Sequence, residues 1–254
     1  MNAAPTVVVH RDPHLLVQAV AARLVTRMVD VQSARGHAHL VLTGGGTGIA
    51  TLAALAACPA RDAIDWAALD VWWGDERFLP EGHPDRNATQ ADDALLRHVR
   101  IPADRVHRMP ATDGPFGDDV DAAAAGYAEL LRGHARAEDH AATPSFDVLL
   151  LGIGPDGHVA SLFPEHPALH VEGSTVVGVR GSPKPPPQRV SLTMPTIRAA
   201  REVWLIAAGP DKATAVALAL TGAGEYAIPA SGAQGRRRTL WLLDRGAASG
   251  LVSG

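Results

Sequence analysis

Short apolar runs rich in β-branched residues alternate along this chain with longer segments of helical period. An apolar run of five to eight residues without polar alternation is typical of a strand buried on both faces of a sheet. Strands are therefore expected over residues 6–10, 39–43, 69–73, 106–109, 146–152, 175–180, 189–193, 202–207 and 239–243.

Helices are expected between these strands, over residues 13–34, 47–57, 88–99, 118–136 and 211–220. Gly36 and Gly222 are placed to end the first and the last helix, and Asn87 to cap the start of the third. Strands that alternate with helices predict an α/β fold with a mainly parallel sheet and helices on both faces. The adjacent strands within 175–193 predict a small antiparallel addition.

The composition agrees with one α/β domain over residues 1–254, because 46% of the residues are hydrophobic. No apolar stretch approaches the roughly 20 residues that span a bilayer. The first residues, MNAAPTVVVHRDPH, lack the apolar core of a signal peptide, and Cys58 is the only cysteine. We therefore expect a cytoplasmic protein without intrachain disulfides or a cysteine-based zinc site.

The net charge of −4 argues against a general nucleic-acid binder, which usually carries a basic field. The run Arg236-Arg237-Arg238 is interpreted as a solvated loop. Of the 23 basic residues only two are lysines, Lys184 and Lys212. Both lie in loop motifs, although chance survival is an equally open explanation.

Unusual residues follow several strands, at the edge where parallel sheets bind ligands. Gly44-Gly45-Gly46-Thr47-Gly48 follows strand 39–43 and opens a helix, so its backbone N–H groups can approach an anion or a sugar oxygen. The motif has neither the Gly-Lys-Ser/Thr ending of a P-loop nor the spacing of a dinucleotide fingerprint. A simple tight turn is the alternative.

Asp75-Glu76-Arg77 follows strand 69–73. The three charges form either a structural clamp or a substrate site. In a substrate site, Asp75 accepts hydrogen bonds from hydroxyl groups and Arg77 binds an anionic group through its planar fork.

Gly154-Pro155-Asp156-Gly157-His158 follows strand 146–152. The glycines allow a sharp turn, and Asp156 and His158 are spaced to face one cavity. A histidine there can take a proton from water near neutral pH, and a carboxylate can orient its ring or contact the ligand. A hydrogen-bonded structural histidine is the alternative.

Residues 182–189, SPKPPPQR, form a rigid extended loop because three consecutive prolines exclude helix and central strand. It presents Lys184 and Arg189 to an anion, unless it is a polyproline docking segment. Gly209-Pro210-Asp211-Lys212 again joins a strand to a helix and places the second lysine at the same edge.

Together these loops resemble the 6-phosphogluconolactonase family. The matching pieces follow the family's order and are TGGGTG (43–48), WWGDERFLP (72–80) with Asn87, LLGIGPDGHVASLFP (150–164), SPKPPPQRVSLT (182–193) and GPDKA (209–213). The family usually has serine and proline around the first glycines. Thr43, Gly46 and Gly48 stand there in this chain, so a backbone contact is expected from that loop.

The resemblance implies a Rossmann-like fold, no metal or organic cofactor, and a carboxylic ester hydrolase of the oxidative pentose phosphate pathway. Its substrate is a phosphorylated sugar lactone, 6-phospho-D-glucono-1,5-lactone. His158 is the suggested general base, with Asp156 orienting it or contacting hydroxyls. No nucleic-acid or membrane partner is expected, and the protein is a monomer or a homodimer. The residues expected to bind substrate are Gly44, Gly45, Gly46, Thr47, Asp75, Arg77, Lys184, Arg189 and Lys212.

Two other functions stay open. The chain also resembles glucosamine-6-phosphate deaminases, but that family carries a catalytic glutamate seven residues after the loop aspartate, where this chain has Phe163. Glu165 lies two residues further on and needs a shifted loop. A non-catalytic sugar-phosphate sensor is the second alternative, and it needs an output module for which no segment is long enough.

Overall fold

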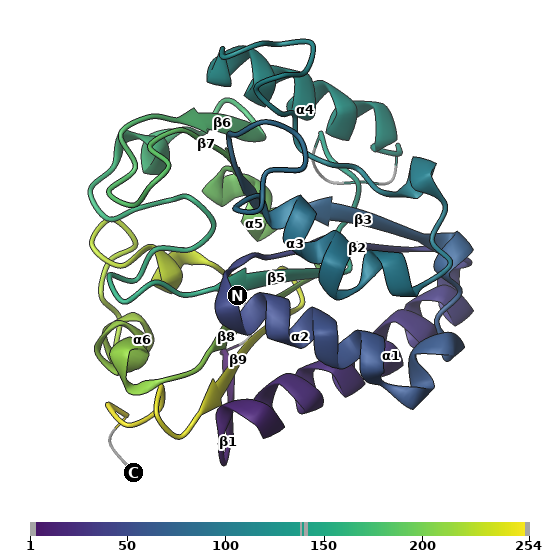
Figure 1. Ribbon diagram of the computed structural model, residues 1–254. Helices are drawn as coiled ribbons and strands as arrows, with labels where there is room; N and C mark the ends of the chain where they lie inside the picture. The colour runs from purple at the N-terminus through teal and green to yellow at the C-terminus, as the bar shows by residue number, and fades with distance from the viewer. Residues whose placement is uncertain (1–3, 138, 140–141, 252–254) are drawn as a thin grey trace.

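A six-stranded parallel sheet forms the centre of the computed structural model, which describes residues 4–137, 139 and 142–251 (Figure 1). Its strand order is β1-β9-β8-β5-β2-β3. Side chains of the inner strands are buried almost throughout, which confirms that the continuous apolar runs are two-sided strands. The strands are β1 (Thr6–His10), β2 (Ala38–Leu42), β3 (Leu69–Trp73), β5 (Val148–Gly152), β8 (Glu202–Ala207) and β9 (Arg238–Asp244).

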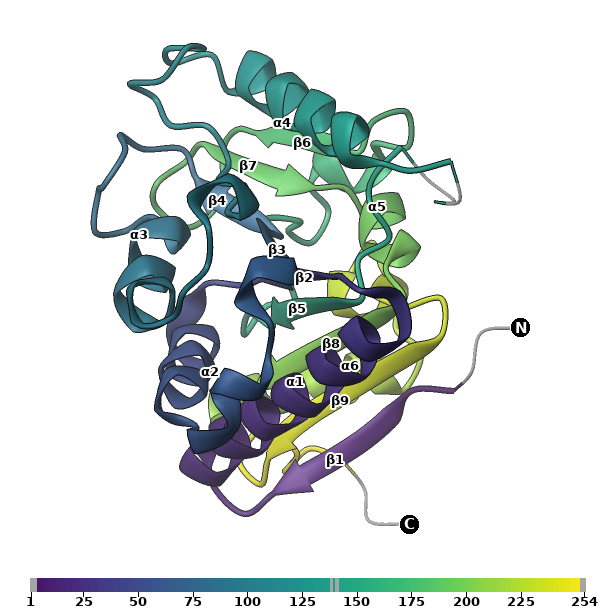
Figure 2. The ribbon, with the colours of Figure 1, turned by 90° about the vertical axis from the view of Figure 1, so that its right-hand side faces the viewer.

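Helices cover both faces of this sheet, as the alternating pattern predicts. The helices are α1 (Pro13–Arg35), α2 (Gly45–Ala57), α3 (Asn87–Ala94), α4 (Val120–His134), α5 (Met194–Ala199) and α6 (Ala213–Leu220). Helices α1 and α2 pack together against one face (Figure 2). The connection from β8 to β9 runs across the sheet in the opposite sense to that from β2 to β3, so right-handed crossovers place α6 on the other face.

The direction of the connections changes between the neighbouring strands β2 and β5. From β2 the chain continues to β3 at one edge, and from β5 it continues through β8 to β9 on the other side. In open parallel sheets the crevice beyond the carboxyl ends at such a point is where ligands bind. The topology therefore selects the loops after β2 and β5 as the place for a site.

A second, three-stranded antiparallel sheet has the order β4-β7-β6, and α4 packs against it (Figure 2). Strands β6 (Val176–Val179) and β7 (Arg189–Leu192) confirm the antiparallel addition expected near residues 175–193. The third strand, β4 (Asp75–Arg77), lies in the loop after β3 and was not expected. Three charged residues carry no strand periodicity, so only the pairing with β7 defines it.

Some local expectations are wrong. Residues 106–109 do not form a strand, because Val106 alone among them makes a β-bridge, to Val71. The side chain of His107 forms a hydrogen bond with Asp70. Asn87 does not cap α3 but is its first residue, since its side-chain amide donates to the backbone of Asp75. That α-helix ends at Ala94 and not at residue 99, and the short helix α5 was not expected.

No helix in the described part of the chain is long and apolar enough to span a bilayer.

Candidate active site

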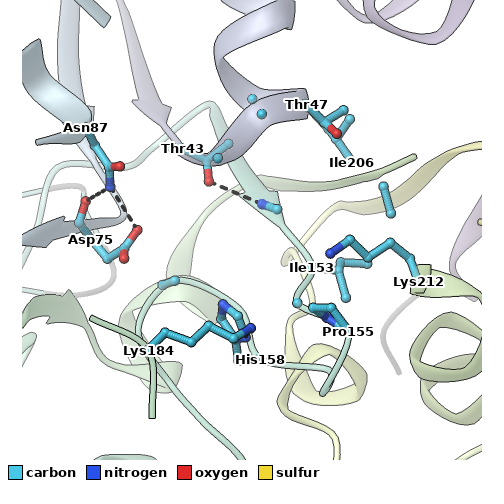
Figure 3. A pocket seen from close by; sticks show the side chains of 18 of the residues that line it. Thr43, Thr47, Asp75, Asn87, Ile153, Pro155, His158, Lys184, Ile206 and Lys212 are labelled. Atoms are coloured by element: carbon cyan, nitrogen blue, oxygen red, sulfur yellow. Dashed lines mark hydrogen bonds between the residues drawn. The ribbon is translucent and has the colours of Figure 1, made fainter. Parts of the chain in front are cut away.

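A cavity of about 200 Å³ opens at the carboxyl edge of the sheet, at the point between β2 and β5 where the connections diverge (Figure 3). It is smaller than the roughly 300–1,000 Å³ typical of drug-sized ligand sites, and so suits a small metabolite. The loops after four parallel strands and the loop 182–189 line it. Among the residues expected from the sequence, the structure brings ten to this cavity: Gly44, Gly45, Gly46, Thr47, Asp75, Arg77, His158, Lys184, Arg189 and Lys212.

The glycine loop brings the start of α2 to the cavity. The helix begins at Gly45, with Gly44 in the cap position, so its first N–H groups have no partners within the helix and carry the positive end of its dipole. Gly44 is required here because a Cβ would lie 1.9 Å from Oδ1 of Asn87. Thr43 joins two strand ends by accepting a hydrogen bond from the N–H of Gly152 at 3.2 Å. This end of α2 therefore presents backbone N–H groups of the kind that can bind an anion.

Asp75 is held in place by residues that sequence reasoning did not assign to the site. Its carboxylate oxygen Oδ2 accepts a hydrogen bond from Ser161 Oγ at 2.7 Å. The side-chain amide of Asn87 donates to the Asp75 carbonyl at 2.8 Å. The only sequence signal for either residue is its place in a motif, DGHVASLFP for Ser161 and the region after WWGDERFLP for Asn87. Asp75 lines the cavity with a fixed orientation, as a hydroxyl acceptor needs.

The clamp interpretation of this loop applies to Glu76. Its carboxylate is fully buried and accepts backbone N–H bonds from Arg77, Asn87 and Ala88 at 2.8, 2.6 and 2.9 Å. Burial raises the pKa of Glu76, and the positive charge of Arg86 opposes that shift. Glu76 therefore joins β4 to the start of α3 and has no access to a ligand.

Arg77, the next residue, is among the residues that line the cavity. Its Nη1 donates to the carbonyl of Asp85 at 2.7 Å, which braces the guanidinium from the outer loop.

His158 and Asp156 form a hydrogen-bonded pair, with 2.5 Å between His158 Nδ1 and Asp156 Oδ1. The expectation that both face the cavity is met by His158 alone, because His158 lines the cavity and Asp156 is not among its lining residues. An ionised carboxylate accepts a hydrogen bond from Nδ1–H, so the neutral ring keeps its lone pair on Nε2. Gly154 makes room for the pair, since a Cβ there would lie 1.9 Å from His158 Nδ1.

The Asp156 carboxylate stays ionised. Burial by itself raises the pKa of Asp156, but the hydrogen bond from His158 and the positive charges of His158 and Lys184 outweigh it. The net result is a pKa well below the usual range. An ionised Asp156 can accept the hydrogen bond from the imidazole N–H of His158 and hold the ring in one orientation.

Arg189 organises the proline loop that carries Lys184. Its Nε donates to the Pro186 carbonyl at 2.9 Å, and its Nη2 donates to the carbonyls of Lys184 and Pro185 at 3.1 and 2.9 Å. The side chain is buried, and burial lowers the pKa of Arg189 while Asp75 opposes the shift. The loop is therefore a wall of the cavity.

Lys212 ends a short 3₁₀ turn, Pro210–Lys212, after β8, and its Nζ lies 3.0 Å from Asp211 Oδ2. Figure 3 shows Lys212 and Lys184 approaching the cavity from different loops, with His158 beside Lys184. Among the described residues, no group of three or more histidine, cysteine or acidic side chains is arranged to hold a metal ion.

A parallel α/β sheet with a cation-lined polar cavity at its switch point, and a carboxylate-bound histidine in that cavity, is typical of enzymes that act on small anionic metabolites. Comparison with known proteins specifies the class further. A model of the glucosamine-6-phosphate isomerases/6-phosphogluconolactonase family matches residues 11–241. The chain belongs to this family.

Known proteins are similar to this chain over nearly its whole length. A 6-phosphogluconolactonase from Streptomyces coelicolor is 65% identical over 251 residues, which cover 99% of this chain and 96% of the relative. The crystal structure of 6-phosphogluconolactonase from Leishmania guyanensis superposes with a TM-score of 0.83 at 27% identity, covering 99% of this chain and 100% of the other. A monomeric glucosamine-6-phosphate deaminase has a TM-score of 0.77 at 23% identity over 96% of this chain and 99% of the other. That last likeness concerns the fold alone.

Proposed function

We propose that this enzyme hydrolyses 6-phospho-D-glucono-1,5-lactone to 6-phospho-D-gluconate, the lactonase step of the oxidative pentose phosphate pathway, with His158 as general base. The observation that supports it most is the 2.5 Å bond between His158 Nδ1 and Asp156, in a ring that lines the cavity. That bond leaves Nε2 as the proton acceptor. The names of relatives up to 65% identical support the substrate.

In the proposed reaction, His158 Nε2 takes a proton from water as the water oxygen bonds to the lactone carbonyl carbon. The carbonyl becomes an oxyanion, stabilised by the N–H groups at the start of α2 or by a cation of the cavity. When the oxyanion collapses, the bond to the ring oxygen breaks and the imidazolium returns its proton to that oxygen. Water is consumed, the ring opens, His158 is neutral again, and the new carboxylic acid releases its proton to the solvent to give the gluconate.

Substrate recognition follows the charges of the cavity. The phosphate carries two negative charges near neutral pH and is held by cations among Arg77, Arg189, Lys184 and Lys212. Asp75, oriented by Ser161, accepts hydrogen bonds from sugar hydroxyls.

The deaminase alternative is less well supported. Phe163 occupies the position of that family's catalytic glutamate, and its ring lies 4.6 Å from the His158 ring. Glu165 is exposed and does not line the cavity. The non-catalytic sensor differs from the lactonase in that it would bind a sugar phosphate without turnover. The single domain, the cytoplasmic location and the monomeric or homodimeric state stay predictions.

The test is hydrolysis of freshly generated 6-phosphogluconolactone near neutral pH, corrected for the spontaneous rate. Wild type is expected to turn over, and His158→Ala to lose a hundredfold or more of kcat, the usual contribution of a general base. His170→Ala is the matched control, because His170 is exposed on a separate turn. No wild-type turnover would refute the lactonase function. An active His158→Ala variant would refute the role of His158 alone.

A further inference from the structure

The ammonium of Lys184 lies directly beside the His158–Asp156 pair. Its Nζ is 3.3 Å from His158 Nδ1 and 3.5 Å from Asp156 Oδ1. Nδ1 already donates to Asp156, and an ammonium has only donors, so the contact with the ring is not a hydrogen bond. The N–H of the neutral ring and the ammonium of Lys184 instead share one carboxylate.

Two side chains hold the backbone of Lys184 in place. Its carbonyl accepts hydrogen bonds from Ser182 Oγ at 2.8 Å and from Arg189 Nη2 at 3.1 Å. Prolines on both sides restrict the chain further. A loop held in this way fixes the backbone from which the Lys184 side chain reaches the His158–Asp156 pair.

The charges around His158 oppose one another. Asp156 stabilises the protonated ring, whereas the ammonium of Lys184 repels it. Phe163 packs against the ring at 4.6 Å and limits hydration. The other charged groups that line the same cavity are Asp75, Arg77, Arg189 and Lys212. Lys184 is the one whose ammonium an observed contact places beside Nδ1.

We propose that Lys184 is a positioning residue whose ammonium offsets Asp156 and keeps His158 in its neutral, proton-accepting form, in place of holding the substrate phosphate. The inference rests on the proposed general base. Asp156 orients the ring and stabilises the imidazolium formed during attack, but alone it would also favour a ring protonated before substrate arrives. Lys184 restores the neutral ring in the free enzyme without disturbing its orientation. Phosphate binding is then left to Arg77, Arg189 and Lys212.

The experiment is the pH dependence of kcat/KM for wild type, Lys184→Met and Lys184→Arg. Loss of the ammonium favours the protonated ring, so the acid limb of Lys184→Met is expected about one pH unit higher, a shift typical of one nearby charge at a partly exposed site. Lys184→Arg keeps the charge and is expected to return the limb most of the way to its wild-type position. The ionisation of the substrate phosphate affects all variants equally, so the difference between variants is the measurement.

Lys212→Met is the matched control, because it removes the other lysine of the cavity from a loop that does not contact His158. It is expected to raise KM and to leave the acid limb in place. NMR titration of the His158 ring in wild type and Lys184→Met, without substrate, measures the same shift directly and also verifies folding. An upward shift of the ring's titration supports the proposal.

An unmoved acid limb and an unmoved His158 titration in Lys184→Met, with KM raised tenfold or more, would make Lys184 a substrate ligand and overturn the inference. That outcome leaves the proposed function intact, because His158→Ala is tested separately. If His158→Ala retains its activity, the general base and the role of Lys184 fail together.

Discussion

At the scale of single residues, the absence of a side chain at position 154 allows the proposed catalytic pair to form. A Cβ on Gly154 would lie 1.9 Å from His158 Nδ1 and 2.3 Å from Asp156 Oδ1, far inside van der Waals contact. The rigid ring and the short carboxylate cannot both yield without breaking the 2.5 Å bond between them. Position 154 therefore controls the geometry of the base without touching the substrate.

Gly154→Ala is expected to displace His158 and to lower kcat/KM about a hundredfold, close to the loss expected from removing the base itself. Gly173→Ala is the matched control, because a Cβ there meets nothing within 4 Å. Steady-state kinetics and thermal unfolding of both variants make the comparison. Wild-type kcat/KM in Gly154→Ala would contradict the importance of this pair.

At the scale of elements, two segments without regular periodicity are shaped by buried charged groups. Glu76 joins β4 to the start of α3 by accepting three backbone N–H bonds. Arg189 stabilises the loop 182–189 by donating to three of its carbonyls. In each case a charged side chain satisfies backbone groups that neither a helix nor a strand satisfies.

Arg189→Ala is expected to leave three carbonyls of the proline loop without their donor. The free energy of unfolding should fall by about 1–3 kcal/mol, and KM should rise as the cavity wall loosens. Urea denaturation and steady-state kinetics measure both. Arg180→Ala is the control, because its ion pair with Asp121 is exposed and contributes at most about 1 kcal/mol. Equal stability losses in the two variants would contradict the bracing role.

At the scale of the whole molecule, the parallel sheet carries polar groups at both ends. The amino ends of β2 and β3 bring together His39 and Asp70, opposite each other in register. Trp72 Nε1 donates to His39 Nδ1 at 3.3 Å, which requires that nitrogen to be unprotonated. Burial lowers the pKa of His39 to about 4, although the charge of Asp70 opposes the shift.

Because the folded pKa of His39 lies below its ordinary value of 6.5, the unfolded chain binds the proton first. Stability is therefore complete above about pH 6.5 and is lost as the pH falls toward about 4, by up to about 3 kcal/mol. In His39→Gln, which keeps an acceptor for Trp72, this loss is expected to shrink. Urea denaturation at pH 7.5 and pH 4.5 checks it, with exposed His170→Gln as control. If the free energy of unfolding of His39→Gln falls as much between pH 7.5 and pH 4.5 as that of wild type, the acid sensitivity comes from groups other than His39.

Asp70 acts in a lower pH window. Burial raises the pKa of Asp70, but hydrogen bonds from His107 and Arg105, both at 2.8 Å, lower it overall to about 2. Its contribution to stability is present above its ordinary pKa of 3.8 and is lost below it. The two groups can therefore be separated by pH.

By itself, the sequence determined the parallel strands, most of the helices and the loops that meet at the cavity. Buried strands are read from continuous apolar runs, and the carboxyl ends of parallel strands share one edge of the sheet, so loop positions follow from strand positions. The family resemblance came from the same loops, and the family match over residues 11–241 confirms it.

Only the tertiary structure decided how the side chains in those loops divide their tasks. Ser161 and Asp75 are 86 residues apart, and Lys184 and His158 are 26 apart, so no local pattern predicts either contact. The strand β4 exists through its pairing with β7. Asp156 and His158 can pair because Gly154 has no side chain to occupy the space between the turn and the pair. Backbone propensity acts over a few residues, whereas hydrogen-bond partners in a buried polar site are chosen by packing across the whole chain.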